Sequence, residues 1–226
     1  MNISSKKIIL VANSDDIPDV NGMINDQDII VRFNIPNEKK IGITGRRTDI
    51  LFLANTVDLM ERRLKDKKFN DFIDTLEDTA VFFPFEDDLI NKMNPIGKIS
   101  YRKFFIKFKK YIRNSNNDRY INYFSEKNIK VKVIDQSYYW SAKGLMSTDN
   151  LSILSTGFIA IFYFLSNKEY TNYDIYLCGF TFHGWSGHDW EQEKICVLNL
   201  IANKKVHVFC EMDGPKKHVS GCGYEK

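Results

Sequence analysis

Short apolar runs recur along the chain, and several of them are apolar at consecutive positions. Such runs are typical of strands in a parallel sheet that is covered on both faces. They predict strands over 7–13, 28–34, 49–55, 79–85, 129–135, 174–180 and 205–210. Helices are predicted between them, over 56–67, 101–127, 156–165 and 190–202. This alternation predicts an α/β fold with a mostly parallel sheet flanked by helices.

Composition narrows the class of protein. The 226 residues are 43% hydrophobic and 27% charged, which is ordinary for a globular domain. The net charge of +3 is too small to indicate nucleic acid, and it suits an anionic small molecule or a weak membrane-surface contact. No run approaches the roughly 18 apolar residues of a membrane span. Four cysteines without C-x-x-C spacing argue against structural zinc or a disulfide framework, so we expect a cytoplasmic protein.

Three predicted strands end in asparagine, and a fourth ends in glycine and phenylalanine. The residues are Asn13, Asn34, Asn55 and the pair Gly179-Phe180. Ligands bind at the carboxyl ends of strands in such sheets, and an amide offers both donors and acceptors to a ribose, a pyrimidine edge or a phosphate. The alternative is that each asparagine only terminates its strand.

The sequence Ser155-Thr156-Gly157 directly precedes the most apolar predicted helix. A helix that starts here leaves about four backbone N–H groups without partners and carries roughly half a positive charge at that end. Glycine permits close approach to the backbone, so the segment is a candidate phosphate seat. An ordinary serine or threonine N-cap explains the same residues.

Two of the four histidines, His183 and His188, lie in one stretch after the strand 174–180. Carboxylates follow at Asp189, Glu191 and Glu193, and a carboxylate beside an imidazole would fix its tautomer for general-base work. A metal site and a plain polar loop, with Asp189 capping the next helix, are the alternatives. The pair Asp26 and Asp28 precedes a strand rather than following one, so we interpret it as a turn and expect no metal there.

The segment 86–150 is expected to contain a lid or acceptor-binding part. Within it, 101–114 interleaves basic and aromatic residues, which is typical of an amphipathic helix or of docking to the inner membrane face or a charged glycan. No nucleic-acid motif accompanies it. The basic side chains are Arg102, Lys103, Lys107, Lys109, Lys110 and Arg113. Tyr138, Tyr139 and Trp140 form a candidate lid, or else an aromatic loop packed on the sheet.

Four blocks, in order, resemble the sialyl motifs of animal-type sialyltransferases. "IIVRFN" followed by "GITGRRTDILFL" resembles the large motif, and "VANSDD" stands where that family has a Gly-Asn-Ser turn. "LSTGFIAIFYFL" with "DIYLCGF" resembles the small motif, and His188 with Glu193 fits the His-x-x-x-x-Glu of the very small motif. The chain is therefore similar to a bacterial or viral version of this family, here over 1–226 as one Rossmann-like, GT-A-like domain.

The resemblance implies an inverting, metal-independent transfer from a CMP-sugar, with no other cofactor. The donor would be CMP-sialic acid or another ulosonic acid such as CMP-Kdo, and the acceptor a hydroxyl of a surface oligosaccharide or glycolipid, such as lipooligosaccharide or capsule. It implies His188 as the base and His183 near the leaving phosphate. The expected nucleotide-binding set is Asn13, Ser14, Asn34, Asn55, Ser155, Thr156, Gly157, Gly179 and Phe180. A non-catalytic nucleotide- or glycan-binding module and a metal-dependent hydrolase are the alternatives.

Overall fold

The computed structural model describes residues 6–15, 17, 22, 24–37, 39, 41–93, 117–146 and 152–209. Within them a sheet of seven parallel strands has the order β5-β4-β3-β2-β1-β6-β7. The predicted strands are confirmed, each somewhat shorter than expected. Their bounds are Lys6–Val11 (β1), Ile29–Phe33 (β2), Ile50–Phe52 (β3), Ala80–Phe83 (β4), Lys130–Val133 (β5), Tyr173–Cys178 (β6) and His207–Val208 (β7).

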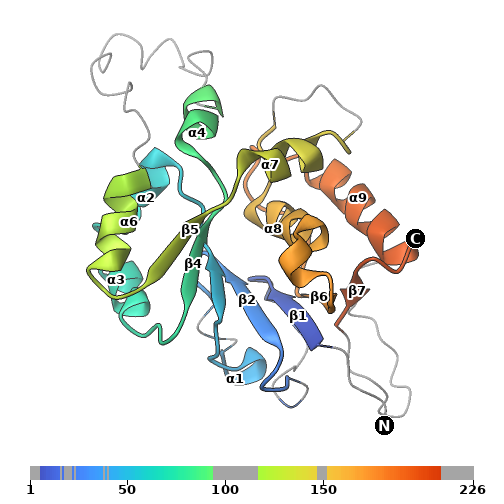
Figure 1. Ribbon diagram of the computed structural model, residues 1–226, viewed down its shortest axis with the longest axis horizontal. Coiled ribbons are helices and arrows are strands. Elements are labelled where there is room, and N and C mark those ends of the chain that lie inside the picture. The colour runs from blue at the N-terminus through green and yellow to red at the C-terminus, as the bar shows by residue number, and fades with distance from the viewer. Residues whose placement is uncertain are drawn as a thin grey trace.

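Helices cover both faces of the sheet (Figure 1). On one side lie α2 (Val57–Arg63), α3 (Lys67–Ile73) and α6 (Asn117–Ser125), and on the other lie α7 (Gln136–Lys143), α8 (Thr156–Ser166) and α9 (Trp190–Ala202). Shorter pieces are α1 (Ile41–Thr44), α4 (Asp87–Met93) and the 3-10 turn η5 (Lys168–Tyr170). None of the helices in the described part of the chain is long and apolar enough to cross a membrane.

The two-sided cover explains why the strands are apolar at consecutive positions. In β3, Ile50 and Phe52 belong to the core cluster formed with α8, whereas Leu51 packs with α2, α3 and α6. Successive side chains of a strand point to opposite faces, so each face of this sheet needs its own apolar set. The helix α8 is buried along most of its length, which fits its almost wholly apolar sequence.

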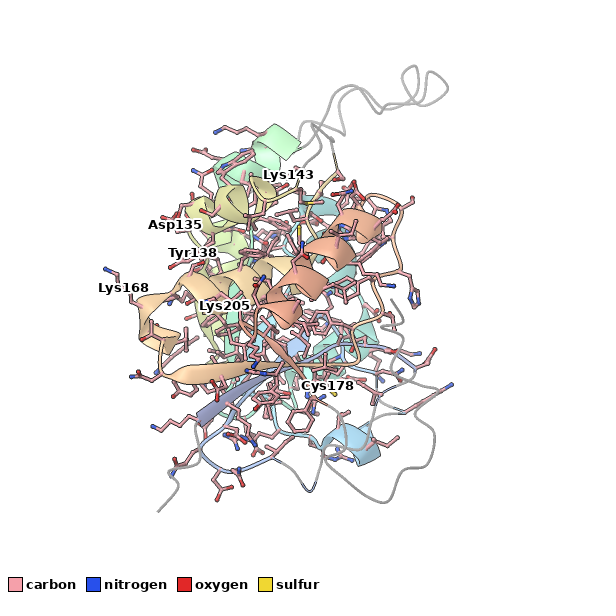
Figure 2. All side chains as sticks on the ribbon, turned by 90° about the vertical axis from the view of Figure 1, so that its right-hand side faces the viewer. Asp135, Tyr138, Lys143, Lys168, Cys178 and Lys205 are labelled. Carbon is pink, nitrogen blue, oxygen red and sulfur yellow. The ribbon has the colours of Figure 1, made fainter. Side chains whose placement is uncertain are left out.

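The direction in which successive strands are added to the sheet reverses at β1. From β1 the chain builds outward through β2, β3, β4 and β5, and it then crosses over to add β6 and β7 on the other side of β1. The carboxyl ends of β1 and β6 therefore form the topological switch point, where open α/β sheets bind their ligands. Cys178, labelled in Figure 2, is the last residue of β6 at this edge. Its carbonyl accepts a hydrogen bond from the N–H of Ala12 at 2.9 Å.

Two sequence predictions need correction. The helix predicted over 56–67 ends at Arg63, and a second helix, α3, begins after Asp66, whose carboxylate accepts a bond from the Lys68 N–H. The aromatic stretch with Tyr138 is a helix, α7, and not a loop. The strand predicted over 129–135 is β5, an edge strand of the sheet, and a lid within 86–150 stays a prediction. The basic residues Arg102, Lys103, Lys107, Lys109, Lys110 and Arg113 lie outside the described residues, so membrane or glycan docking through them stays a prediction.

Candidate functional site

The turn after β1 packs tightly against the end of β6. Gly179 has φ 69°, in the left-handed region that favours glycine. A Cβ atom at Gly179 would lie 2.4 Å from Cγ1 of Ile17 and 3.5 Å from Cβ of Ser14. Only a residue without a side chain fits this contact. Two predicted site residues, Ser14 and Gly179, are therefore side by side at the switch point.

Asn13 and Asn34 also lie together, at the ends of neighbouring strands. The Nδ2 group of Asn13 donates to the carbonyls of the residues just before and just after Asn34, at 2.9 and 3.2 Å. Asn34 has φ 55°, and its Oδ1 accepts bonds from the Ala54 N–H at 3.1 Å and from Nη2 of Arg63 at 2.7 Å. The two amides thus join the ends of three strands, and their contact with a nucleotide stays a prediction.

Asn55 has a different position from the other two asparagines. It is fully buried, and its Nδ2 donates to the carbonyl of Phe85 at 2.7 Å and to Oδ1 of Asn117 at 2.8 Å. Its Oδ1 accepts from the N–H of Phe85 at 3.2 Å. The side chain holds the end of β3 to the segment after β4 and to the start of α6. Because no part of it is exposed, we correct its assignment from nucleotide binding to structural support.

The start of α8 is occupied by a buried carboxylate. Ser155 is the N-cap, and its Oγ accepts a bond from the Phe158 N–H at 3.1 Å. The same hydroxyl donates to Oε2 of Glu193 at 2.6 Å, and the Ser155 N–H donates to Oε1 at 2.7 Å. Glu193 is completely buried, and this desolvation raises its pKa to about 7, although the two Ser155 bonds act in the opposite direction. Ser155 is therefore both a helix cap and the partner of Glu193.

Beyond the cap, α8 keeps backbone donors at its first turn. The N–H groups of Thr156 and Gly157 have no intrahelical partner, as at any helix start, and they make no hydrogen bond with other described residues. The ring of Phe180 lies close to this turn, because a Cβ at Gly157 would be 2.9 Å from Cε1 of Phe180. Phe180 also packs edge-on against Phe33 of β2, with 5.8 Å between ring centroids. Gly157 and Phe180 are thus brought together, as a shared site requires.

His188 is held in one orientation. Its Nδ1 lies 2.7 Å from the carbonyl oxygen of Ile153. A carbonyl only accepts, so Nδ1 carries the proton and Nε2 carries the free lone pair. The ring makes edge contacts with both Trp185 and Trp190, with centroid distances of 4.9 and 4.8 Å. Burial lowers the pKa of His188 below its usual 6.5, while the bond to Ile153 acts against this shift. The imidazole is therefore neutral at pH 7 and able to accept a proton at Nε2.

The carboxylates near His188 do not orient it, contrary to the sequence interpretation. Asp189 caps α9 and accepts a bond from the Gln192 N–H at 3.2 Å, as in the plain-loop alternative. Glu193 turns toward Ser155, and Glu191 is exposed. His183 is exposed as well, and its Nδ1 lies 3.4 Å from the carbonyl of Thr181. Among the described residues, the ring contacts of His188 are with Trp185 and Trp190 and not with His183.

The predicted lid residues belong to α7, which packs against α8 and its leading segment. Tyr138 stacks edge-on against Tyr163 of α8 at 5.1 Å, and Tyr139 is buried next to Phe85 at 6.2 Å. Trp140 is the exposed member, with 48% of its surface accessible. From the end of the same helix, Lys143 donates to the carbonyl of Ser152 at 2.8 Å. Figure 2 shows Tyr138 and Lys143 on this helix. Tyr138 and Tyr139 are thus packing residues, and Trp140 remains a lid candidate.

The acidic pair before β2 has a structural position. Asp28 is buried, and its two carboxylate oxygens accept bonds from the N–H groups of Lys7 and Asn25 at 3.1 and 2.9 Å. It lies at the amino end of the sheet, opposite the switch point. In the described ranges no three His, Cys, Asp or Glu side chains are grouped to hold a metal ion. Independence of metal remains a prediction.

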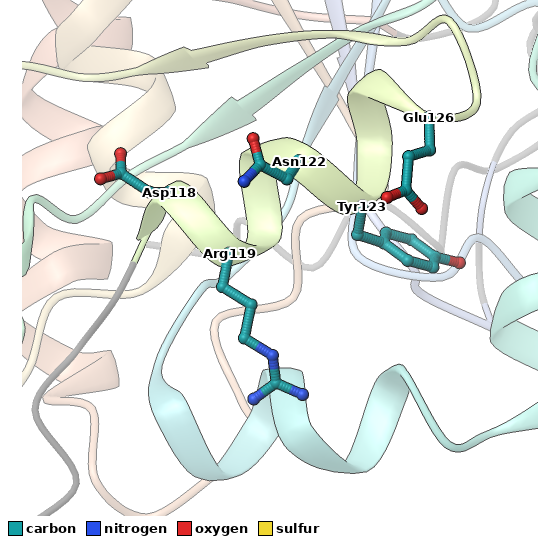
Figure 3. A pocket seen from close by; sticks show the side chains of 5 residues that line it. All are labelled: Asp118, Arg119, Asn122, Tyr123 and Glu126. Atoms are coloured by element: carbon teal, nitrogen blue, oxygen red, sulfur yellow. The ribbon is translucent and has the colours of Figure 1, made fainter.

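A surface depression of about 490 Å³ lies away from these residues (Figure 3). Its lining comes from one helix, α6, and Arg119 there pairs with Glu61. Figure 3 shows the side chains spread along the exposed side of the helix. None of its lining residues follows a strand at the switch point, so we do not regard it as the functional site. Its lining residues are Asp118, Arg119, Asn122, Tyr123 and Glu126.

Two residues of the site were not found by sequence reasoning in their actual roles. Glu193 was assigned to His188, although its spacing of four from the buried Val197 predicts the inward face of α9. Trp185 was not singled out, yet it is 60% exposed and stacks against His188. The Ile153 carbonyl, which fixes the imidazole, has no sequence signal because every residue has a carbonyl group.

Fold and site together define a doubly wound, parallel α/β protein with polar residues and a neutral histidine near the switch point. No family model matches the sequence, and no curated protein matches it. Solved structures do match in fold. The sialyltransferase CstII from Campylobacter jejuni, in complex with the substrate analogue CMP-3FNeuAc, has a TM-score of 0.50 and 14% identity, over 91% of this chain and 80% of that chain.

A variant of the sialyltransferase Cst-II in complex with CMP gives the same TM-score of 0.50 and 14% identity, over 91% of this chain and 80% of that chain. The apo alpha-2,3-sialyltransferase from Campylobacter jejuni has a TM-score of 0.46 and 18% identity, over 90% of this chain and 74% of that chain. The first two likenesses establish that this chain has a fold similar to that of CstII. The predicted α/β fold class is thereby confirmed.

Proposed function

We propose that this protein is a CMP-sugar-dependent glycosyltransferase of the sialyltransferase type. It transfers sialic acid, or a related ulosonic acid such as Kdo, to a hydroxyl of an oligosaccharide or glycolipid acceptor. The observation that carries this proposal is His188, whose Nδ1–H is bound to the Ile153 carbonyl so that Nε2 is free to accept a proton. The similarity in fold to a sialyltransferase crystallised with CMP-3FNeuAc supports the choice of donor.

The reaction would be a single displacement with inversion. The acceptor oxygen attacks the anomeric carbon of the donor and gives its proton to Nε2 of His188. The bond from the anomeric carbon to the phosphate oxygen breaks, and CMP leaves with the electron pair. One attack from the face opposite the leaving group inverts the configuration at that carbon.

The leaving phosphate needs electrostatic support, and the first turn of α8 offers it. The N–H groups of Thr156 and Gly157 and the positive end of the helix dipole would stabilise the charge on CMP without a metal ion. The ring of Phe180 lies against the Cα side of Gly157 at this turn, so it would border a phosphate bound there. Asn13, Ser14 and Asn34 would contact the nucleotide from the adjoining strand ends. His183, on the following loop, would assist the phosphate.

The test is transfer from CMP-sialic acid and from CMP-Kdo to a panel of oligosaccharide acceptors, with and without EDTA. We expect transfer to persist in EDTA. His188→Ala should lower the rate by roughly 10²- to 10⁴-fold, the usual contribution of a general base. The matched control is His207→Gln, because His207 lies on β7 and stacks on Tyr176. Near-normal transfer by His188→Ala at an unchanged melting temperature would contradict the assignment of the base.

The alternative is a non-catalytic nucleotide- or glycan-binding module of the same fold. Such a module would show a higher melting temperature with CMP but neither hydrolysis nor transfer of a CMP-sugar. A metal-dependent hydrolase would contain stoichiometric metal by elemental analysis. The acceptor class, a bacterial surface glycan, follows from the sequence resemblance alone. Docking to the inner membrane face rests only on the basic residues within 101–114.

A further inference from the structure

Trp185 is the most exposed of the large hydrophobic side chains that the structure describes, with 60% of its surface accessible. Single exposed apolar residues are common on protein surfaces and need no explanation by themselves. What distinguishes Trp185 is its place beside His188, with the two rings nearly perpendicular at 84° and 4.9 Å between centroids. An exposed indole thus borders the imidazole that is proposed to receive the acceptor proton.

The backbone that carries the indole is fixed. The main-chain carbonyl of Trp185 accepts a bond from Nε1 of Trp190 at 3.0 Å and from the His188 N–H at 3.2 Å. Its benzene ring lies directly over Gly187, where an added Cβ would be 2.2 Å from Cη2. Glycine at this position therefore determines where the ring can lie. A ring fixed before binding loses little conformational entropy when a ligand covers it.

The neighbouring contacts show what can reach this surface. The imidazole of His188 contacts the rings of Trp185 and Trp190. Its Nδ1 is bonded to the Ile153 carbonyl, so Nε2 is the ring nitrogen that remains for an incoming hydroxyl. A hydroxyl at Nε2 brings the rest of its sugar ring close to Trp185. The nucleotide, by contrast, is expected at the strand ends with Asn13 and at the first turn of α8.

The chemistry of Trp185 suits a sugar ring. A pyranose has one face rich in C–H bonds, which stacks on the electron-rich face of an indole and leaves the hydroxyls at the ring edge free. Tryptophan is a large, rigid and amphipathic contact residue. We propose that Trp185 is the platform on which the acceptor pyranose stacks, with its reacting hydroxyl directed to Nε2 of His188. This inference rests on the proposed transferase function.

The experiment measures the KM for acceptor and for CMP-sugar separately in three variants. Trp185→Ala should raise the acceptor KM about 3- to 10-fold and leave the donor KM unchanged. Trp185→Phe should recover most of the acceptor binding, because the phenyl ring keeps an aromatic face. Gly187→Ala should resemble Trp185→Ala, because the added methyl displaces the indole. The control is Ile195→Ala, an exposed apolar residue on α9.

The possible outcomes are distinguishable. A rise in the donor KM instead of the acceptor KM would mean that the indole stacks on the cytosine, and it would overturn the proposal. Unchanged kinetics in Trp185→Ala would do the same while leaving the transferase function intact. Failure of the unaltered protein to transfer from any CMP-sugar would instead refute the proposed function. In that case no change of acceptor KM could be measured in any variant.

Discussion

Glu193 should make the free energy of unfolding depend on pH, and the substitution Glu193→Gln should remove that dependence. The carboxylate is buried between α9 and the start of α8 and receives the N–H and the hydroxyl of Ser155. Desolvation is the main cause that raises its pKa from 4.5 to about 7. Asp189 acts in the same direction, and Lys143 with the Ser155 bonds acts against it.

The direction of the pH dependence follows from the raised pKa of Glu193. The folded protein holds the Glu193 proton more tightly than the unfolded chain does, so the neutral form stabilises the fold. This stability is fully present below pH 4.5 and is lost as the pH rises through about 7. At about 1.4 kcal/mol for each tenfold change in the dissociation constant, the complete loss is about 3 kcal/mol. Glu193→Gln keeps the shape but cannot ionise, so this fall should be missing from its stability profile.

The assay is urea unfolding of the wild type and Glu193→Gln at pH 5, 6, 7 and 8, with free energies from linear extrapolation. We expect the variant to gain stability relative to the wild type between pH 5 and pH 8, by up to about 3 kcal/mol. Glu191→Gln is the matched control, because Glu191 is exposed on the same helix. Parallel profiles for the wild type and Glu193→Gln would refute the reasoning, since they would mean that burial does not hold the proton on Glu193.

Two further predictions concern stability and the pH dependence of the rate. Asn55→Ala removes the buried amide that bonds Phe85 and Asn117, so the free energy of unfolding should fall by about 2–4 kcal/mol in urea titration. The control Asn122→Ala, at an exposed position on α6, should change it by less than about 0.5 kcal/mol. Equal effects of the two substitutions would contradict the structural role of Asn55. Because burial lowers the pKa of His188, the base form should persist below pH 6.5, so kcat/KM should rise with pH and reach half its maximum below that value. A half-maximal rate above pH 6.5, in the wild type and in Glu193→Gln alike, would argue against His188 as the base.

The sequence was a good guide to the sheet because burial on two faces leaves a strong local signal. Consecutive apolar residues such as Ile50 and Leu51 can only be satisfied between two helical layers. The rule that ligands meet the carboxyl edge then placed Asn13 and Asn34 at the same edge of the sheet without knowledge of the strand order. The order itself depends on long-range pairing, such as that of β1 with β6, which no local pattern encodes.

Asn55 shows where the same reasoning failed. It follows its strand in the same manner as the other two asparagines, yet its partners lie 30 and 62 residues away at Phe85 and Asn117. Whether an asparagine at a strand end faces solvent or is buried depends on which later segment covers it. That information lies in tertiary packing, so the residue type and its spacing could not distinguish a ligand contact from a structural bond.

The prediction that a neighbouring carboxylate orients His188 failed for a related reason. Its correction shows how His188 is connected to the start of α8, the other half of the proposed site. Adjacency in sequence suggested that a carboxylate orients His188, but a helix start directs Asp189 to the cap and Glu193 toward α8. Residues 153–155 instead bond both His188 and Glu193. The carbonyl of Ile153 fixes the imidazole, and the N–H of Ile153 donates to the Gly187 carbonyl at 3.1 Å. Ser155 caps α8 and also bonds Glu193.

This arrangement explains why a carboxylate remains buried at a cost to stability. A hydrophobic residue in place of Glu193 would avoid desolvation, but it could not bond the N–H and hydroxyl of Ser155 together. Those bonds keep the start of α8 fixed relative to α9, and therefore relative to His188, which directly precedes the cap of α9. In a displacement reaction, the base and the leaving-group seat must be held at a constant separation, because a misplacement of about 1 Å can cost about 10²-fold in rate. In the proposed transferase, the buried Glu193–Ser155 pair would provide that constraint, because it joins two elements that are distant in sequence.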